Sequence, residues 1–356
     1  MGQRINPIDP MAPQLNLLNR VTSGGLGRET FTQQGRDVRV AAIVEIKNLT
    51  KRYGRLTAVR DVSLSVEEGS VFGFVGPNGA GKTTTMRILT TLLRPTSGEA
   101  WVGGCSVIKD PRGVRRQVGY MPDFFGVYND MLVWEYLDFF AACYDVPQSK
   151  RPALIDDLLA LVDLGHRRND PLNSLSRGMK QRLCLARTLA HDPAVLILDE
   201  PASGLDPRAR IEIRELLREL QAMGKTIFFS SHILSEVEEI CTAIGVIEAG
   251  QLVACGTLEE LRALRPVRVL RIGLLGRLDE ARALLVSLDG VQEVVDDPGP
   301  AWNGGLGLRV SFRGDDEAVS GLLAQVVAAG LPVISFTEET ADLEDVFMQV
   351  TRGIVS

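Results

Sequence analysis

The sequence predicts an α/β fold that is interrupted by a helical insertion and followed by a small α+β domain. Apolar runs at 71–75 and 195–198 lack polar alternation, as expected for central parallel strands that are buried on both faces. A helical pattern follows each run, so strands and helices alternate as they do in parallel sheets. Residues 267–337 predict the element order βαββαβ, which favours a ferredoxin-like α+β domain.

Length and composition limit the classes of function. The 356-residue chain is long enough for two domains and an extension, and 45% apolar content supports hydrophobic cores. A net charge of -6 argues against general nucleic-acid binding, so we expect no nucleic-acid partner. No apolar run reaches the ~18 residues that a membrane helix needs, so any membrane role must come through a partner. The five scattered cysteines favour reduced thiols in a cytosolic protein over disulfides or a zinc site.

Residues 1–42 predict a flexible N-terminal extension. Prolines and a Ser-Gly-Gly segment break any periodicity in this polar stretch. Two interpretations stay open, an artefact of an upstream start site and a short tether.

The α/β domain is expected to span 43–264, with a helical subdomain at about 123–180. Its other predicted elements are strands at 43–46, 58–66, 99–102, 118–122 and 226–229, helices at 83–93 and 208–223, and a hairpin at 244–254. Apolar residues near 132–140 and 154–164 recur at helical spacing and predict the helices of the insertion.

The C-terminal domain is expected to span 265–356, beginning at an Arg-Pro pair. Its predicted elements are strands at 267–274, 291–296, 307–313 and 332–337 and helices at 278–288, 316–329 and 342–351. It carries no cluster of titratable residues that would indicate chemistry.

A glycine-rich turn between the strand at 71–75 and the next helix has the pattern G-x-x-x-x-G-K-T. Its residues are Gly76, Pro77, Asn78, Gly79, Ala80, Gly81, Lys82, Thr83 and Thr84. Its glycines allow successive backbone N–H groups to face an anion, and the following helix adds its positive end. Lys82 supplies a charge for the β- and γ-phosphates, and the Thr83 hydroxyl suits Mg²⁺. The turn therefore predicts a nucleotide-phosphate site.

Two acidic residues and a histidine follow the other predicted buried strands. Asp199 can hold Mg²⁺, and Glu200 can accept a proton from an attacking water. His232 follows the strand at 226–229 and is a candidate sensor of the γ-phosphate. The alternatives are a solvated acidic pair and a satisfied core histidine.

A second helix start suited to phosphate lies about ninety residues further along the chain. Ser176 is a natural N-cap, and Gly178 permits close approach. Because a small domain seldom needs two such sites for one nucleotide, we expect a two-fold dimer in which this helix end meets the nucleotide of the other subunit. An ordinary capped helix is the alternative.

Taken together and in this order, the motifs over residues 43–262 resemble those of the ATPase subunit of an ABC transporter. The resemblance implies a P-loop NTPase core with an antiparallel β subdomain. It also implies that Tyr53 stacks on adenine, that 175–182 is the signature and 195–200 Walker B, that 203–206 is the D-loop and that His232 is the switch histidine. The signature reads Ser-Arg-Gly-Met where Ser-Gly-Gly-Gln is usual, but Ser176 and Gly178 are retained.

Asp123 stands where the family usually has the glutamine of the Q-loop. An ionised aspartate only accepts hydrogen bonds and adds negative charge beside the γ-phosphate. We expect Asp123 to keep a contact with Mg²⁺. The aromatic segment that follows, with Phe124, Phe125 and Tyr128, is a candidate groove for a permease, and a small satellite core is the alternative.

The resemblance implies an ATP- and Mg²⁺-dependent ATPase that pairs with a second subunit, identical or related, and drives a separate permease. The whole layout is most similar to ATPase subunits of ABC-2 type exporters, which would place the chain on the cytoplasmic face of the membrane. A soluble ABC-type ATPase that acts on a ribosomal or nucleic-acid partner is the alternative. A P-loop kinase or GTPase is disfavoured by the signature segment and His232.

Overall fold

The computed structural model describes most of the chain in five stretches: 42–123, 126, 131–263, 267–297 and 306–339. Three predictions therefore lie outside the described residues. They concern the extension before Ala42, the aromatic segment with Phe124, Phe125 and Tyr128, and a last helix at 342–351. By its internal contacts the chain divides into a unit at Gly126–His191 and a unit made of Ala42–Phe125 and Asp192–Ser356. Each part is described by itself.

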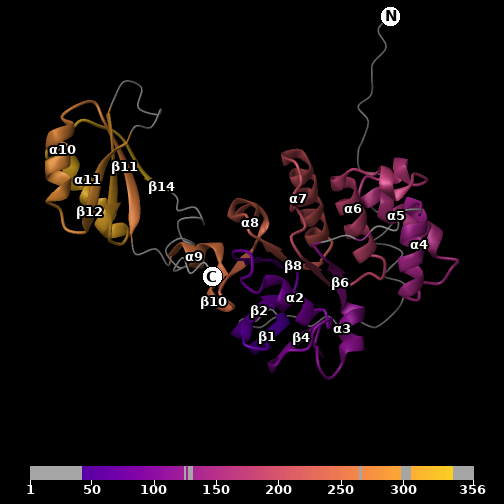
Figure 1. Ribbon diagram of the computed structural model, residues 1–356. Helices are drawn as coiled ribbons and strands as arrows, with labels where there is room; N and C mark the ends of the chain where they lie inside the picture. The colour runs from indigo at the N-terminus through magenta and orange to yellow at the C-terminus, as the bar shows by residue number, and fades with distance from the viewer. Residues whose placement is uncertain (1–41, 124–125, 127–130, 264–266, 298–305, 340–356) are drawn as a thin grey trace, which may run out of the picture. The chain divides into compact units, whose positions relative to one another are not determined.

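A six-stranded sheet forms the centre of the second unit, in the order β10-β9-β3-β8-β7-β6 (Figure 1). The strands are β3 (Val71–Val75), β6 (Val118–Met121), β7 (Val195–Leu198), β8 (Thr226–Ser231), β9 (Ala243–Glu248) and β10 (Gln251–Thr257). All pairs from β9 to β6 are parallel, and β10 turns back antiparallel to β9. Every residue of β3 and β7 is buried, as their continuous apolar sequences predict.

Several strands of this sheet are followed by helices of the same unit. The helices are α2 (Lys82–Leu89) after β3, α7 (Pro207–Ala222) after β7 and α8 (Leu234–Ile240) after β8, and α9 (Leu258–Ala263) follows the hairpin. The prediction of a helix to residue 93 was wrong, because α2 ends at Leu89. Thr91 has a φ of 63°, a left-handed conformation that an α-helix does not continue through. A capping box begins α9, since Thr257 and Glu260 exchange side-chain to backbone hydrogen bonds of 2.8 and 3.2 Å.

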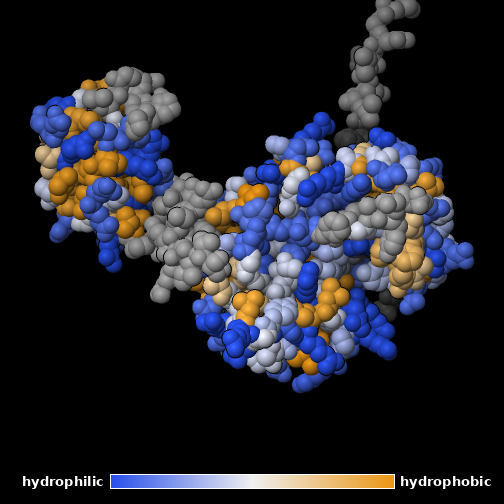
Figure 2. Space-filling model, in the orientation of Figure 1, coloured by the Kyte–Doolittle hydropathy of each residue, from blue (hydrophilic) through white to orange (hydrophobic). Residues whose placement is uncertain are grey.

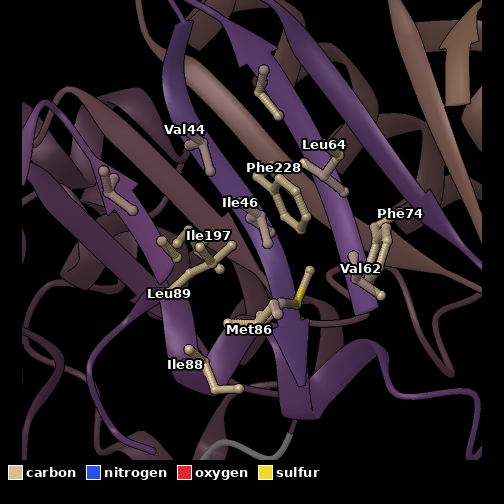
Figure 3. Close-up of a cluster of buried hydrophobic side chains, with 14 of the residues drawn as sticks. Val44, Ile46, Val62, Leu64, Phe74, Met86, Ile88, Leu89, Ile197 and Phe228 are labelled. Carbon is tan, nitrogen blue, oxygen red and sulfur yellow. The ribbon is translucent and has the colours of Figure 1, made fainter. Parts of the chain in front are cut away.

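A second sheet, antiparallel and in the order β2-β1-β4-β5, belongs to the same unit. It consists of β1 (Ala42–Tyr53), β2 (Leu56–Glu67), β4 (Ser97–Val102) and β5 (Cys105–Ser106), and the helix α3 (Pro111–Gln117) follows. Figure 3 shows the core between the two sheets, where Val44, Leu64, Met86 and Phe228 point toward one another from β1, β2, α2 and β8. Ala80 of the glycine-rich turn belongs to this core, which therefore supports the turn.

The helical unit contains α4 (Val133–Cys143), α5 (Arg151–Leu161) and α6 (Arg177–Thr188), with the 3₁₀ turns η1 (Gly165–Arg167) and η2 (Leu172–Ser174). The three α-helices pack against one another. Ser176 caps α6 as expected, because its Oγ accepts a hydrogen bond from the Met179 N–H at 3.3 Å. Contacts extend the unit to His191, beyond the boundary near residue 180 that the sequence predicts.

The C-terminal part has the predicted order βαββαβ and an antiparallel sheet arranged β12-β13-β11-β14. Its elements are β11 (Arg268–Leu274), α10 (Leu278–Val286), β12 (Val291–Asp297), β13 (Leu306–Phe312), α11 (Asp316–Ala328) and β14 (Val333–Glu339). Figure 1 shows α10 and α11 on one face of this sheet, and their buried apolar residues form its core. Figure 2 shows hydrophobic residues on its visible face. Within the described residues, no helix of the chain is both long and apolar enough to cross a membrane.

Candidate functional site

The glycine-rich turn joins β3 to α2, and at two positions its path leaves no room for a side chain. A Cβ at Gly76 would lie 2.1 Å from the carbonyl oxygen of Ile247, and a Cβ at Gly81 would lie 2.5 Å from that of Ala58. Gly81 also has a φ of 108°, in the region that favours glycine. The turn rests on the β9–β10 hairpin through a hydrogen bond of 3.0 Å from the Gly250 N–H to the Ala80 carbonyl. Close backbone packing therefore fixes the shape of the turn.

An open cavity of about 280 Å³ lies over this turn. Most of the site residues predicted for this unit line the cavity. Ala58 and Ser203 line it as well, although the sequence assigns them no chemical role. The lining residues are Ala58, Pro77, Asn78, Gly79, Gly81, Lys82, Thr83, Thr84, Asp123, Glu200, Ser203 and His232. The fold thus brings together residues from six separate places in the sequence.

Lys82 opens α2 and is 6% exposed. Its ammonium donates to the carbonyl oxygens of Gly76 at 2.7 Å and Pro77 at 3.2 Å. The same nitrogen lies 3.4 Å from Oε1 of Glu200. A buried cation is therefore held at the centre of the turn, within reach of an anion that enters the cavity.

Asp199 follows β7 and is 1% exposed. Its Oδ1 accepts hydrogen bonds from the hydroxyls of Thr83 at 3.2 Å and Ser230 at 2.8 Å. Burial raises the pKa of this carboxyl, the two hydroxyls oppose that effect, and the charges of Asp123 and Glu200 add to it. The net result is a pKa above the ordinary value.

The residues around Asp199 fit a magnesium ion. The Thr83 hydroxyl and the carboxylates of Asp199 and Asp123 are hard oxygen donors, the type that Mg²⁺ takes in proteins. Burial is the main cause of the raised pKa of Asp199, and the negative charges of Asp123 and Glu200, which add to it, are charges that a divalent cation would neutralise.

Glu200 faces the cavity from a left-handed backbone conformation, with a φ of 51°. Its Oε2 lies 2.7 Å from Nδ1 of His232. The His232 side chain is 44% exposed, so it is a cavity residue and the alternative of a core histidine is wrong. A carboxylate held between an ammonium and an imidazole is suited to take up and pass on a proton at this place.

Tyr53, Ser176 and Gly178 are not among the residues that line the cavity. Tyr53 ends β1, is 46% exposed and has the Lys51 ammonium 5.2 Å from its ring centroid, which excludes simple core packing. Ser176 and Gly178 belong to the helical unit. Their proposed nucleotide contacts therefore stay predictions.

Two buried polar residues next to the site escaped sequence reasoning. Ser230 contacts both acids, and Glu236 is 8% exposed and accepts a hydrogen bond from Ser231 at 3.3 Å. Burial raises the pKa of the Glu236 carboxyl more than its hydrogen bond to Ser231 and the charge of Arg210 lower it. The register of β7 and β8 is the signal that could have placed Ser230 beside Asp199.

Comparisons with known proteins find relatives over most of the chain. Residues 59–203 match the family model described as "ABC transporter". The chain is 35% identical to "Nod factor export ATP-binding protein I" of Ralstonia nicotianae over 309 residues, covering 87% of this chain and 94% of that protein. It is 30% identical to "Linearmycin resistance ATP-binding protein LnrL" of Bacillus subtilis, covering 87% and 98%.

Solved structures extend the comparison to the fold. "Structure of ATP binding subunit of ABC transporter" has a TM-score of 0.57 and 30% identity, and the match covers 62% of this chain and 92% of that one. "Dimeric structure of a post-hydrolysis state of the ATP-binding cassette MJ0796 bound to ADP and Pi" has a TM-score of 0.55 and 25% identity, with 60% and 98% covered. These likenesses establish the P-loop ATPase fold of the region they cover.

Proposed function

Because the chain belongs to the ABC transporter family, as an ATP-binding subunit and ATPase, we propose that two such subunits close around two ATP molecules and drive a separate membrane permease for export. The cavity over the glycine-rich turn carries this proposal. It gathers Lys82, Glu200 and His232 from one unit, and Ser176 and Gly178 belong to the other unit. A site of this kind needs its other half from a second subunit.

The turn and Lys82 bind the phosphates. Inward-facing N–H groups and the start of α2 hold the phosphate oxygens, and the Lys82 ammonium exchanges the Gly76 and Pro77 carbonyls for the β- and γ-phosphates. Tyr53, which is exposed at the end of β1, stacks on the adenine. Ser176 and Gly178 of the second subunit approach the γ-phosphate with the N-terminal end of α6.

Glu200 and His232 carry out the hydrolytic step. Glu200 orients the attacking water and accepts its proton, and His232, 2.7 Å away, holds the Glu200 carboxylate and donates to the γ-phosphate. Thr83, Asp199 and Asp123 would hold Mg²⁺. The ion, when bound, supplies positive charge that neutralises the phosphates.

Export is favoured by the relatives, one named for Nod factor export and another for linearmycin resistance. The permease would place this chain on the cytoplasmic face of the membrane, as in ABC-2 type systems. The segment with Phe124, Phe125 and Tyr128 is the proposed permease groove. A soluble role on a ribosomal or nucleic-acid partner is not favoured, because these relatives are named for export and resistance and the net charge is -6.

The dimer is tested with the Glu200→Gln variant, which should bind ATP and hydrolyse it only at a small residual rate. In saturating Mg-ATP we expect light scattering after size exclusion to give twice the mass of the chain. Lys82→Ala should stay monomeric because it binds ATP poorly. Glu200→Gln combined with Gly178→Glu should bind ATP and yet stay monomeric, since the new carboxylate repels the γ-phosphate.

A Glu200→Gln chain that stays monomeric, with no companion ATPase able to pair with it, would refute this proposal. The permease is tested separately by purifying the tagged chain from detergent-solubilised membranes of its own cells. We expect an integral membrane protein with several apolar spans to accompany it. Recovery with ribosomes or nucleic acid instead would support the soluble alternative.

A further inference from the structure

Ser230, the penultimate residue of β8, contacts Asp199 and Glu200, the two acidic residues after β7, with one hydroxyl. It is fully buried. Its Oγ donates to Oδ1 of Asp199 at 2.8 Å and accepts a hydrogen bond from the backbone N–H of Glu200 at 2.9 Å. The donor and acceptor functions of the hydroxyl are therefore both used, and both connect β8 to the end of β7.

The sheet itself creates this contact. β7 and β8 are parallel neighbours, and Leu198 pairs with Phe229. Beyond that pair the β7–β8 ladder ends, so Asp199 meets Ser230 just after β7 has left the sheet, while Ser230 itself still pairs with Phe74 of β3. The N–H of Glu200 there finds a side chain in place of a strand partner.

The contact matters because Glu200 has an unfavourable backbone conformation. Its φ of 51° lies in the left-handed region, which costs energy for a residue with a Cβ and persists only when surrounding contacts impose it. From this conformation the carboxylate reaches Nδ1 of His232 at 2.7 Å and the Lys82 ammonium at 3.4 Å. A different φ at Glu200 would turn the carboxylate away from both.

We propose that Ser230 is a positioning residue for ATP hydrolysis, whose hydroxyl holds the Glu200 backbone in the left-handed conformation and thereby places the Glu200 carboxylate. The inference rests on the proposed role of Glu200 as the group that accepts the proton from water. Ser230 itself touches neither water nor nucleotide in this role. It acts through Glu200.

The test begins with Ser230→Ala, which removes the hydroxyl and adds no volume. Because a displacement of about 1 Å costs on the order of 10²-fold in rate, we expect kcat to fall roughly 10- to 100-fold. KM for ATP and the affinity for a fluorescent ATP analogue should change less than about 3-fold, because the phosphate loop is untouched. Ser230→Thr, which keeps the hydroxyl, should restore most of kcat.

Thr226→Val is the matched control for a lost buried hydroxyl in the same strand. Thr226 is also fully buried and accepts a hydrogen bond from the Gly69 N–H at 2.9 Å, at the other end of β8. We expect this variant to lose a similar amount of thermal stability and to keep the kcat of the unmodified chain. If Ser230→Ala does not fold, Ser230→Cys gives the same test, since a thiol is a weak donor and acceptor.

A double-mutant cycle with Glu200→Gln separates positioning from a general effect. If Ser230 acts through Glu200, then Ser230→Ala should change the residual rate of Glu200→Gln by less than about 2-fold. An equal loss in both backgrounds would overturn the inference, as would an unchanged kcat in Ser230→Ala. A Glu200→Gln variant with full activity would instead refute the proposed role of Glu200.

Discussion

Alanine at Gly76 is expected to distort the phosphate turn by a purely steric effect. The added Cβ would lie 2.1 Å from the Ile247 carbonyl oxygen, whereas close carbon-to-oxygen contacts in proteins begin at about 3.3 Å. The turn or β9 must therefore move by about 1.2 Å. Overpacking of this kind costs roughly 1–3 kcal/mol, which corresponds to a loss of about 5- to 150-fold in ATP affinity if the nucleotide needs the undistorted turn.

Two neighbouring glycines serve as controls that separate crowding from backbone conformation. Alanine at Gly79 meets nothing within 4 Å, but its φ of 81° is unfavourable for alanine, so the expected cost is about 1–2 kcal/mol. Alanine at Gly81 combines a φ of 108° with a contact of 2.5 Å to the Ala58 carbonyl, so it should be the most damaging. The expected order of damage is Gly81, then Gly76, then Gly79.

The assay is equilibrium binding of a fluorescent ATP analogue to each purified variant, with thermal unfolding measured in parallel. An unchanged Kd for Gly76→Ala would refute the reasoning, because it would mean that the Ile247 carbonyl yields without disturbing the turn. A larger loss of affinity in Gly79→Ala than in Gly76→Ala would mean that the added methyl group acts mainly by a clash with the nucleotide, and not by a clash with the β9 backbone.

Three further predictions concern the acidic residues. Asp123→Ala should raise the Mg²⁺ concentration that gives half-maximal ATPase activity by several-fold, and an unchanged Mg²⁺ dependence would exclude Asp123 from the metal site. Glu200→Gln should bind a non-hydrolysable ATP analogue about 3- to 10-fold more tightly, because Lys82 loses a charged competitor at 3.4 Å; an equal Kd would contradict this. Glu236→Gln should raise Tm at pH 8 by about 2–4 °C. Burial raises the pKa of the Glu236 carboxyl, so Glu236 contributes most to stability below its ordinary pKa of 4.5. That contribution is lost as pH rises through the raised pKa. The gain in Tm from Glu236→Gln should therefore shrink toward pH 4.5.

The sequence predicts the parts of the fold whose signal is local. The apolar runs of β3 and β7 are continuous, and each is buried throughout. The G-x-x-x-x-G-K-T turn and the cap at Ser176 are also local patterns, and both occur where expected. In each case the signal lies within a few neighbouring residues, so it is recognisable without knowledge of distant contacts.

What the sequence does not predict depends on contacts between distant residues. The end of α2 is set by the left-handed Thr91, and no glycine marks that position. Strand β1 is continuous from Ala42 to Tyr53, because register shifts near Leu49 keep it paired with β2. Ser230 shows its role only once the register of β7 and β8 is known. These features are products of pairing, which a linear pattern does not carry.

In the proposed mechanism the Lys82 ammonium connects ATP binding to catalysis. It is 6% exposed, its Glu200 partner is 13% exposed, and a buried cation of this kind cannot lose one anionic partner without gaining another. An incoming γ-phosphate is such a partner, so the arrival of ATP and the release of the Glu200 carboxylate from Lys82 become one event. Glu200 then depends on His232 and on its own backbone for its position. On this proposal the hydroxyl of Ser230 holds that backbone, so a residue outside the cavity lining determines whether the freed carboxylate faces the attacking water.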